Sequence, residues 1–167
     1  MNQTVAQLVV ISGRSGSGKS TALHVLEDLG YYCIDNLPAS LIPNLVDRSK
    51  QQKLSAKIAV SIDARNSAAD LEDFPLAITQ IQDFDVRVIF LDAASPTLIK
   101  RFSETRRKHP LSTQEMGLKE ALNVESQLLD GLAMMASLKI DTTHMTLHQL
   151  RDEVRDRVAN TTQFTTI

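Results

Sequence analysis

The sequence has few of the features that mark disulfide-bonded, membrane-spanning or strongly nucleic-acid-binding proteins. Its 167 residues include one cysteine, Cys33, so no disulfide can form within the chain, which fits a reducing compartment. The formal net charge of −2 provides no overall basic field for nucleic acid. No apolar run approaches the roughly 18 residues of a membrane span. The N-terminus lacks the basic start of a signal peptide, so we expect a cytoplasmic protein.

The composition that remains is that of an ordinary globular domain. Hydrophobic residues make up 43% of the chain and charged residues 23%. A chain of this length is long enough to bury one sizeable core. The polar, threonine-rich end has no apolar pattern. We therefore expect one domain over residues 1–160, followed by a linker or the end of a fragment over residues 161–167.

Short apolar runs without alternation predict strands that are buried on both faces. Such runs occupy residues 8–12, 31–35, 58–63, 86–91 and 138–141. Apolar residues at helical spacing predict helices over residues 20–29, 40–53, 68–82, 95–108, 118–132 and 147–158, although Pro75 disfavours the third. This alternation predicts an α/β fold with a parallel sheet and helices on both faces. Ligands of such sheets bind at the carboxyl ends of the strands.

A glycine-rich loop connects the first predicted strand to the first predicted helix. Its sequence, GRSGSGKS, fits the phosphate-binding pattern G-x-x-x-x-G-K-[ST]. Glycines allow backbone conformations in which successive N–H groups point at a polyphosphate, and the following helix adds its positive end. The pattern predicts a P-loop NTPase fold of the nucleotide-kinase-like kind. The predicted nucleotide-binding residues of the loop are Gly13, Arg14, Ser15, Gly16, Ser17, Gly18, Lys19 and Ser20.

Two side chains of the loop have predicted roles beyond the main-chain cradle. The Lys19 ammonium can bridge the outer phosphates, as a catalytic group, and the Ser20 hydroxyl can ligate Mg²⁺. A metal at this place also needs a carboxylate from a neighbouring strand. Asp63 ends one apolar strand and Asp92 ends another, and the pattern alone does not separate them. We favour Asp63 for the metal; the alternative is an aspartate that caps a loop.

Basic residues gather behind the fourth predicted strand, in the sequence KRFSETRRKHP. Guanidinium groups there can neutralise charge on a transferring phosphoryl group, and we assign this catalytic role to Arg106 and Arg107. A solvated basic helix end explains the cluster almost equally well. Contact with RNA phosphates is a weaker explanation, because no aromatic residues stand beside the cluster for base stacking.

Other polar residues have plainer interpretations. Cys33 falls in a predicted buried strand, so we expect an unreactive core thiol. The four histidines show no metal-ligand spacing with other ligands. Asp35 follows the second predicted strand, where it either contacts a phosphoryl acceptor or forms part of a turn.

The motifs together resemble those of the RapZ/YvcJ family of P-loop nucleotide-binding proteins, from about residue 8 to residue 158. The resemblance is carried by SGRSGSGKSTALHVLEDLGYYCIDNLP, SIDARN, IFLDA and RFSETRRKHPLS, which are far more specific than the phosphate loop alone. It implies binding of ATP and GTP with weak hydrolysis. By position, it places the ATP site at Gly13 to Ser20 and a GTP site at Asp63, Ala64, Arg65 and Asn66.

The resemblance also implies a biological role. This chain resembles a family whose best-studied members are RNase adapters, which bind a small regulatory RNA, present it to an endoribonuclease and so tune amino-sugar synthesis. In these proteins a second, C-terminal domain makes the RNA contacts, and this chain stops where that domain would begin. We therefore expect a nucleotide-gated regulatory module that is able to form a homo-oligomer. The alternatives are a small-metabolite or nucleotide kinase and, less well supported, RNA binding by this domain itself.

Overall fold

We analysed a computed structural model of the chain, which describes residues 6–52, 57–82, 84–105, 108–112 and 117–159. The predicted linker, residues 161–167, lies outside the described residues. The elements follow one another as β1 (Ala6–Gly13), α1 (Lys19–Asp28), β2 (Tyr32–Ile34), the 3-10 helix η1 (Ala39–Leu41), α2 (Ile42–Gln52), β3 (Lys57–Ser61), α3 (Ala68–Thr79), β4 (Phe84–Asp92), α4 (Ser95–Thr105), α5 (Leu118–Leu128), α6 (Asp130–Met135), β5 (Leu138–Asp141) and α7 (Leu147–Ala159).

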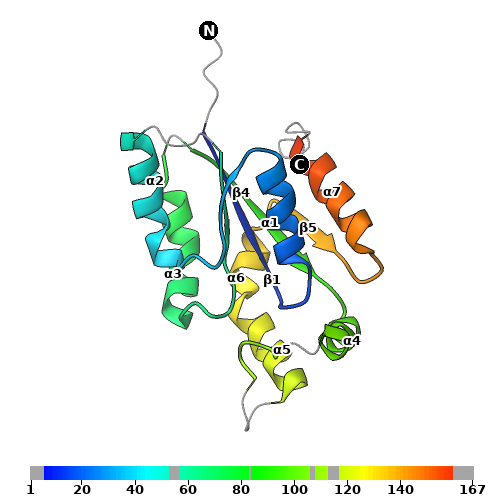
Figure 1. Cartoon of the computed structure of the whole chain (residues 1–167). Helices are drawn as coiled ribbons and strands as arrows, with labels where there is room; N and C mark the ends of the chain where they lie inside the picture. Colours follow the sequence, from blue (N-terminus) through cyan, green and yellow to red (C-terminus); the bar gives the residue numbers. More distant parts are fainter. Residues whose placement is uncertain (1–5, 53–56, 83, 106–107, 113–116, 160–167) are drawn as a thin grey trace.

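The five strands of the described chain form one sheet in the order β2-β3-β1-β4-β5, and every neighbouring pair is parallel. β1 lies at the centre of the sheet, and helices cover its side chains on both faces. Val9 and Ile11 pack under α1 and α7, whereas Leu8 and Val10 pack against α2, α3 and α6. Figure 1 shows the helices on both faces of the sheet. The predicted fold class is confirmed.

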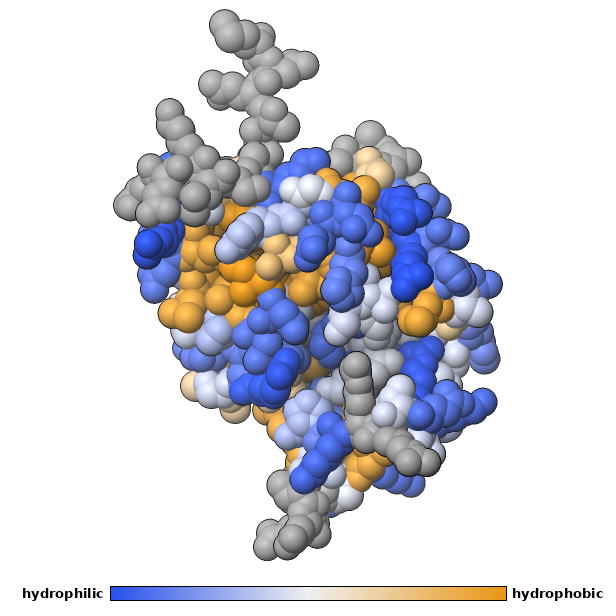
Figure 2. All heavy atoms as spheres, in the orientation of Figure 1, coloured by the Kyte–Doolittle hydropathy of each residue, from blue (hydrophilic) through white to orange (hydrophobic). Residues whose placement is uncertain are grey.

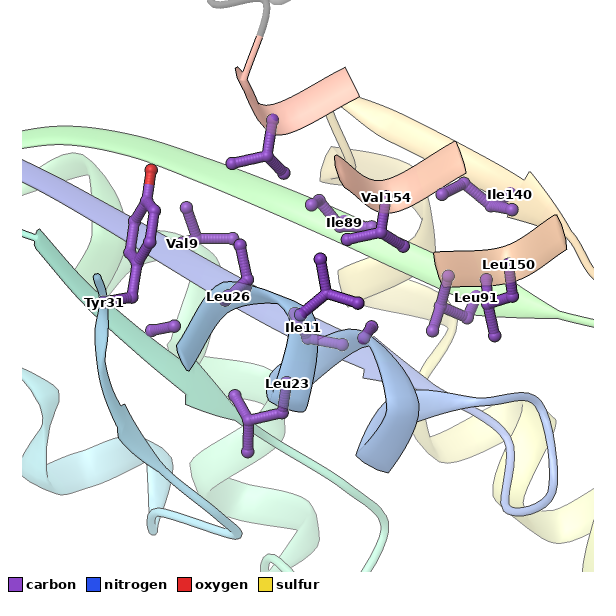
Figure 3. Close-up of a cluster of buried hydrophobic side chains, with 14 residues drawn as sticks. Val9, Ile11, Leu23, Leu26, Tyr31, Ile89, Leu91, Ile140, Leu150 and Val154 are labelled. Atoms are coloured by element: carbon purple, nitrogen blue, oxygen red, sulfur yellow. The ribbon is translucent and has the colours of Figure 1, made fainter. Parts of the chain in front are cut away.

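The core under α1 and α7 holds these two helices against the sheet (Figure 3). Leu26 of α1 and Val154 of α7 are fully buried and face Ile11 and Ile89 of the central strands. Each such side chain contributes about 1.5–3 kcal/mol through its removal from water. This face therefore fixes α1, which begins where the glycine-rich loop ends.

One predicted helix, residues 118–132, is two helices in the structure. α5 ends at Leu128 and α6 begins at Asp130, with Leu129 in a non-helical conformation between them. The two parts pack against different partners. Leu122 of α5 joins a small cluster with Leu98 and Phe102 of α4, whereas Leu132 of α6 packs against the sheet. A straight helix cannot serve both surfaces, so the chain turns at Leu129.

The surface is mostly polar, with an apolar patch between α2 and α1 (Figure 2). Within the described part of the chain, none of the helices has both the length and the apolarity that a membrane crossing requires.

Candidate functional site

The carboxyl ends of the parallel strands meet around one cavity of about 650 Å³. Residues 15–21, from the loop behind β1 and the first turn of α1, form one wall. Asp35 behind β2, Asp63 and Arg65 behind β3, and Thr142 behind β5 contribute further polar groups. The volume lies within the 300–1,000 Å³ typical of small-molecule sites. The segments that the sequence placed behind separate strands therefore converge on one cavity.

The three glycines of the loop have backbone conformations that disfavour any other residue. Gly13, Gly16 and Gly18 have φ angles of +148°, +87° and +114°. A Cβ atom at Gly13 would overlap the Leu91 carbonyl oxygen, and one at Gly18 would overlap the Leu150 side chain. Gly18 is also the N-cap of α1, so the unpaired N–H groups of this helix open toward the loop. This geometry is that of an anion-binding loop.

Lys19 lies across the loop. Its Nζ donates a hydrogen bond to the Gly13 carbonyl oxygen at 2.8 Å. Desolvation lowers the pKa of this ammonium, and the nearby negative charges of Glu125 and Asp63 oppose the shift. Both the ammonium and the exposed Ser20 line the cavity. The Lys19 side chain thus provides a positive charge where a phosphate group would sit.

The Arg14 side chain stabilises the loop from the side of β4. Its buried guanidinium donates to Asp92 Oδ1 at 2.8 Å, to Ser95 Oγ at 2.9 Å and to the Ala93 carbonyl oxygen at 2.7 Å. The side chain therefore braces the loop against the junction of β4 and α4, and only the main chain of Arg14 remains for a phosphate. The same contacts occupy Asp92, which is not among the described residues that line the cavity.

The loop serines also differ in position. The Ser17 side chain is fully buried, and its hydroxyl has no hydrogen-bond partner among the described residues. The Ser17 carbonyl oxygen accepts from Thr142 Oγ1 at 2.8 Å. Arg101 joins this contact, since its Nη1 donates to Thr142 Oγ1 at 3.0 Å and to the Gly16 carbonyl oxygen at 2.9 Å. The loop therefore makes stabilising contacts with Thr142 behind β5 as well as with the end of β4.

The segment behind β3 places two of its four predicted residues at the cavity. Asp63 and Arg65 line it, whereas Ala64 is buried. Asn66 connects two loops instead, because its Oδ1 accepts from the Ala39 N–H at 2.7 Å.

Arg65 engages both oxygens of the Asp63 carboxylate. Its Nη2 donates to Asp63 Oδ2 at 2.6 Å, and its Nε lies 3.0 Å from Oδ1 and 3.1 Å from Oδ2. Burial by itself would raise the pKa of the Asp63 carboxyl, but the hydrogen bonds from Arg65 hold it below its usual value. The carboxylate is therefore negatively charged and already paired.

The polar groups around Lys19 suit Mg²⁺ shared with phosphate oxygens. Ser20 and Asp63 both line the cavity, and hydroxyl and carboxylate oxygens are the protein ligands that Mg²⁺ prefers. Among the described residues, no group of three or more histidine, cysteine, aspartate or glutamate side chains could hold a metal without further ligands. A metal here would need phosphate oxygens to complete its coordination.

The predicted basic cluster divides in the structure. Arg101 and Lys108 line the cavity, whereas Lys100 is exposed and lies 4.0 Å from Glu104 in an ion pair. Arg106 and Arg107, the predicted catalytic arginines, lie outside the described residues.

Two further residues named from the sequence, Asp35 and Cys33, lie in or directly after β2. Asp35 lines the cavity, and its Oδ1 accepts a hydrogen bond from Ser61 Oγ at 2.6 Å. Cys33 is half-buried, and burial together with Glu27 raises the pKa of its thiol to about 11. A thiol with this pKa is almost entirely protonated at neutral pH, as expected of an unreactive cysteine.

Sequence reasoning missed two residues that lie behind the loop: Glu125, which contacts Ser15, and His109, which contacts Glu125. Glu125 of α5 is fully buried and accepts from the Ser15 N–H at 2.8 Å and from Ser15 Oγ at 2.7 Å. His109 Nε2 lies 2.9 Å from the same carboxylate. One signal was available: Glu125 occupies a position on the otherwise apolar face of its helix. A charged residue at such a position needs buried partners.

The fold and the loop together define a P-loop nucleotide-binding protein with a kinase-like sheet. A gluconokinase from Sinorhizobium meliloti superposes with a TM-score of 0.57 at 16% sequence identity, covering 99% of this chain and all of that protein. The YorR protein of Bacillus subtilis, solved with phosphorylated GDP, gives a TM-score of 0.55 at 16% identity over 92% of this chain and 96% of its own. At such identities the likeness shows the fold alone.

The chain belongs to the RapZ-like N-terminal domain family, whose model matches residues 6–162. A nucleotide-binding protein of Hahella chejuensis is 56% identical over 158 residues, which are 91% of this chain and 54% of that protein. One of Pseudomonas aeruginosa (strain LESB58) is 53% identical, over 92% of this chain and 55% of that protein. The chain therefore spans about half the length of these curated relatives, and the resemblance noted from the motifs is confirmed.

Proposed function

We propose that this chain binds ATP and GTP together with Mg²⁺ and hydrolyses them slowly. One observation carries the proposal: three glycines with positive φ shape a loop whose lysine and serine face a cavity at the carboxyl edge of the sheet. The names of the curated relatives, which are nucleotide-binding proteins, support it.

In this proposal the chain's own groups have separate tasks. The loop amides and Lys19 hold the phosphates, and Ser20 and Asp63 supply two ligands to Mg²⁺. The metal, when bound, adds charge neutralisation at the phosphates. Arg106 and Arg107 neutralise the charge that develops on the outermost phosphate. The Asp63–Asn66 segment forms the second part of the nucleotide site, in which Asp63 and Arg65 face the ligand.

In this proposal the Arg65–Asp63 ion pair would keep hydrolysis slow. Arg65 covers both oxygens of the carboxylate, so Asp63 is available to a metal only after this pair opens. The Arg65 side chain is 49% exposed, whereas that of Asp63 is 7% exposed. The Arg65 side chain is therefore the one of the two that can move away into solvent.

We also propose that the chain is the nucleotide-binding module of a longer cytoplasmic RNase adapter. In that protein a small regulatory RNA and an endoribonuclease would be the partners, and amino-sugar synthesis the regulated process. Support comes from the family membership and from relatives nearly twice as long as this chain. Bound nucleotide would alter the loops at the cavity, and thereby contacts with a further domain or a second copy of the chain.

A small-metabolite or nucleotide kinase is the second candidate, and the residues that line the cavity support it. Beyond the loop the cavity continues to Asp35 and Arg65, which leaves space for a phosphoryl acceptor. Incubation with labelled ATP and candidate sugars or nucleotides tests this. Rapid transfer of label to any of them would place the kinase function first.

The nucleotide site is tested by Lys19→Ala. We expect calorimetric titration with Mg-ATP to show binding by the unaltered chain and none by the variant, because the variant lacks the ammonium that faces the phosphates. Its circular dichroism spectrum should be unchanged. The matched control is Lys100→Ala, which removes an exposed lysine outside the cavity. Equal heats of binding for Lys19→Ala and the unaltered chain would contradict the proposal.

A further inference from the structure

A buried histidine–glutamate pair lies directly behind the tip of the glycine-rich loop. The side chains of Glu125 and His109 are both 0% exposed, and His109 Nε2 lies 2.9 Å from Glu125 Oε1. The glutamate comes from α5, and the histidine from the short segment that follows α4. Both oxygens of the carboxylate also accept from Ser15, one from its N–H and one from its hydroxyl. Three separate parts of the chain thus meet at one carboxylate.

The hydrogen bonds fix the form of the histidine. The Leu111 N–H donates to His109 Nδ1 at 3.0 Å, so Nδ1 carries no proton. The ring proton is therefore on Nε2, which donates it to Glu125. The pair then carries one negative charge, held by three donors, which offsets the cost of burying a carboxylate. Burial by itself would raise the pKa of Glu125, but His109 and Ser15 hold it below its usual value, so the group is ionised.

The segment that carries His109 also borders the cavity. Lys108 and Pro110 both line it, and the turn is closed by the Ser112 N–H, which donates to the His109 carbonyl oxygen at 2.9 Å. The His109 ring lies 5.5 Å from that of Phe102, another residue of the cavity wall. A short chain of contacts therefore runs from Ser15 through Glu125 and His109 to the turn.

We propose that Glu125 is a positioning residue of the nucleotide site and that, through His109, it couples the phosphate loop to the turn formed by residues 108–112. A ligand that orders the loop would fix Ser15, and with it Glu125, His109 and the Leu111 N–H. Because the same turn carries Lys108, bound nucleotide would through this coupling determine the position of the Lys108 positive charge. This inference rests on the proposed nucleotide site.

Amide hydrogen exchange by NMR on the unaltered 167-residue chain measures the coupling at Leu111. We expect saturating Mg-ATP to slow exchange of the Leu111 amide by at least about tenfold, because its acceptor becomes fixed. In His109→Asn, the new amide oxygen lies near the position of Nδ1 and can still accept from Leu111. It offers Glu125 no donor at the position of Nε2, so Mg-ATP should bind without slowing exchange at Leu111.

Glu125 itself is tested with two variants. Glu125→Gln keeps an acceptor for the Ser15 N–H and for His109, so it should retain most of the response at Leu111. Glu125→Leu has similar bulk but leaves the Ser15 N–H and the histidine without their acceptor. It should bind Mg-ATP at least about tenfold more weakly and show no response. The control is His24→Asn, which changes an exposed histidine of α1 and should respond as the unaltered chain does.

Distinct results overturn the two proposals. If the unaltered chain binds Mg-ATP but exchange at Leu111 does not change, the coupling is wrong and the nucleotide site stands. A full response in His109→Asn also overturns the coupling, even if Glu125→Leu does not fold. Failure of the unaltered chain to bind Mg-ATP or Mg-GTP overturns the nucleotide site and this inference with it.

Discussion

Asp63 and Asp92 have the same position in the sequence pattern, at the end of an apolar strand, but different surroundings in the structure. Asp63 faces the cavity and Lys19, whereas Asp92 accepts from the buried Arg14 and from its own neighbour, the Ala93 N–H. The difference comes from the loop. The Arg14 side chain reaches the end of β4 and engages Asp92. Of these two carboxylates, Asp63 is the one that lines the cavity together with Lys19 and whose negative charge opposes the lowering of the Lys19 pKa.

Asp63→Asn should abolish the effect of Mg²⁺ on nucleotide binding. The amide keeps the shape of the side chain but lacks the charge that attracts the metal. We expect Mg²⁺ to strengthen ATP binding by the unaltered chain at least about tenfold and to leave the variant nearly unaffected. Fluorescence titration with an ATP analogue, with and without Mg²⁺, measures this.

Asp92→Asn is the matched control for that experiment. It should keep the Mg²⁺ effect but lower the free energy of unfolding by about 1–3 kcal/mol, because the buried Arg14 loses its charged partner. The assignment of Asp63 fails if Asp92→Asn is the variant that loses the Mg²⁺ effect.

At the residue scale, the sequence predicted those site residues that are recognised by their spacing along the chain. The loop from Gly13 to Ser20 was recognisable because the positions of its glycines and lysine are fixed by chain geometry. The direction of the Arg14 side chain was not, because it depends on Asp92 and Ser95, about eighty residues further along the chain. Glu125 and His109 were missed for the same reason, since only the fold brings Ser15 and His109 to Glu125.

At the scale of elements, the start of α1 depends on its contact with α7. Gly18 has a φ angle of +114°, and a Cβ atom there would overlap the side chain of Leu150, which is buried in α7. The element order was predictable because each strand is a short apolar run between turn residues. The break at Leu129 was not, since it follows from α5 packing on α4 while α6 packs on the sheet.

Gly18→Ala should therefore destabilise the protein as well as the nucleotide site. We expect the free energy of unfolding to fall by about 1–3 kcal/mol, from strain at positive φ and from crowding at Leu150. Urea denaturation followed by circular dichroism measures this.

Gly131→Ala provides the comparison for Gly18→Ala. Gly131 lies within α6, and a Cβ atom there has nothing within 4 Å. Replacing this helical glycine should leave stability unchanged or raise it by up to about 1 kcal/mol. Similar losses in the two variants would show that the contact with Leu150 does not matter.

At the scale of the whole molecule, two buried carboxylates make stability depend on pH. The pKa values of Asp63 and Glu125 are both below their usual values in the folded chain. A group of this kind stabilises the fold fully above its unfolded pKa, which is about 4 for both types, and the stabilisation is lost as the pH falls through its folded pKa.

The double variant Asp63→Asn/Glu125→Gln tests this acid sensitivity. Urea denaturation between pH 6 and pH 3 should show a smaller loss of stability in the variant than in the unaltered chain, because neither replacement can take up a proton. The variant should also be the less stable of the two at pH 6. Parallel pH curves for the two proteins would show that other groups govern acid unfolding.

The central position of β1 in the sheet has a consequence for the synthesis of the protein on the ribosome. β1 is made first, yet its two neighbours, β3 and β4, begin only at Lys57 and Phe84. At roughly 5–20 residues per second, β1 waits on the order of ten seconds for the second of them. Throughout that interval the emerging polypeptide carries an unpaired apolar segment, which is the kind of segment that other nascent chains can bind.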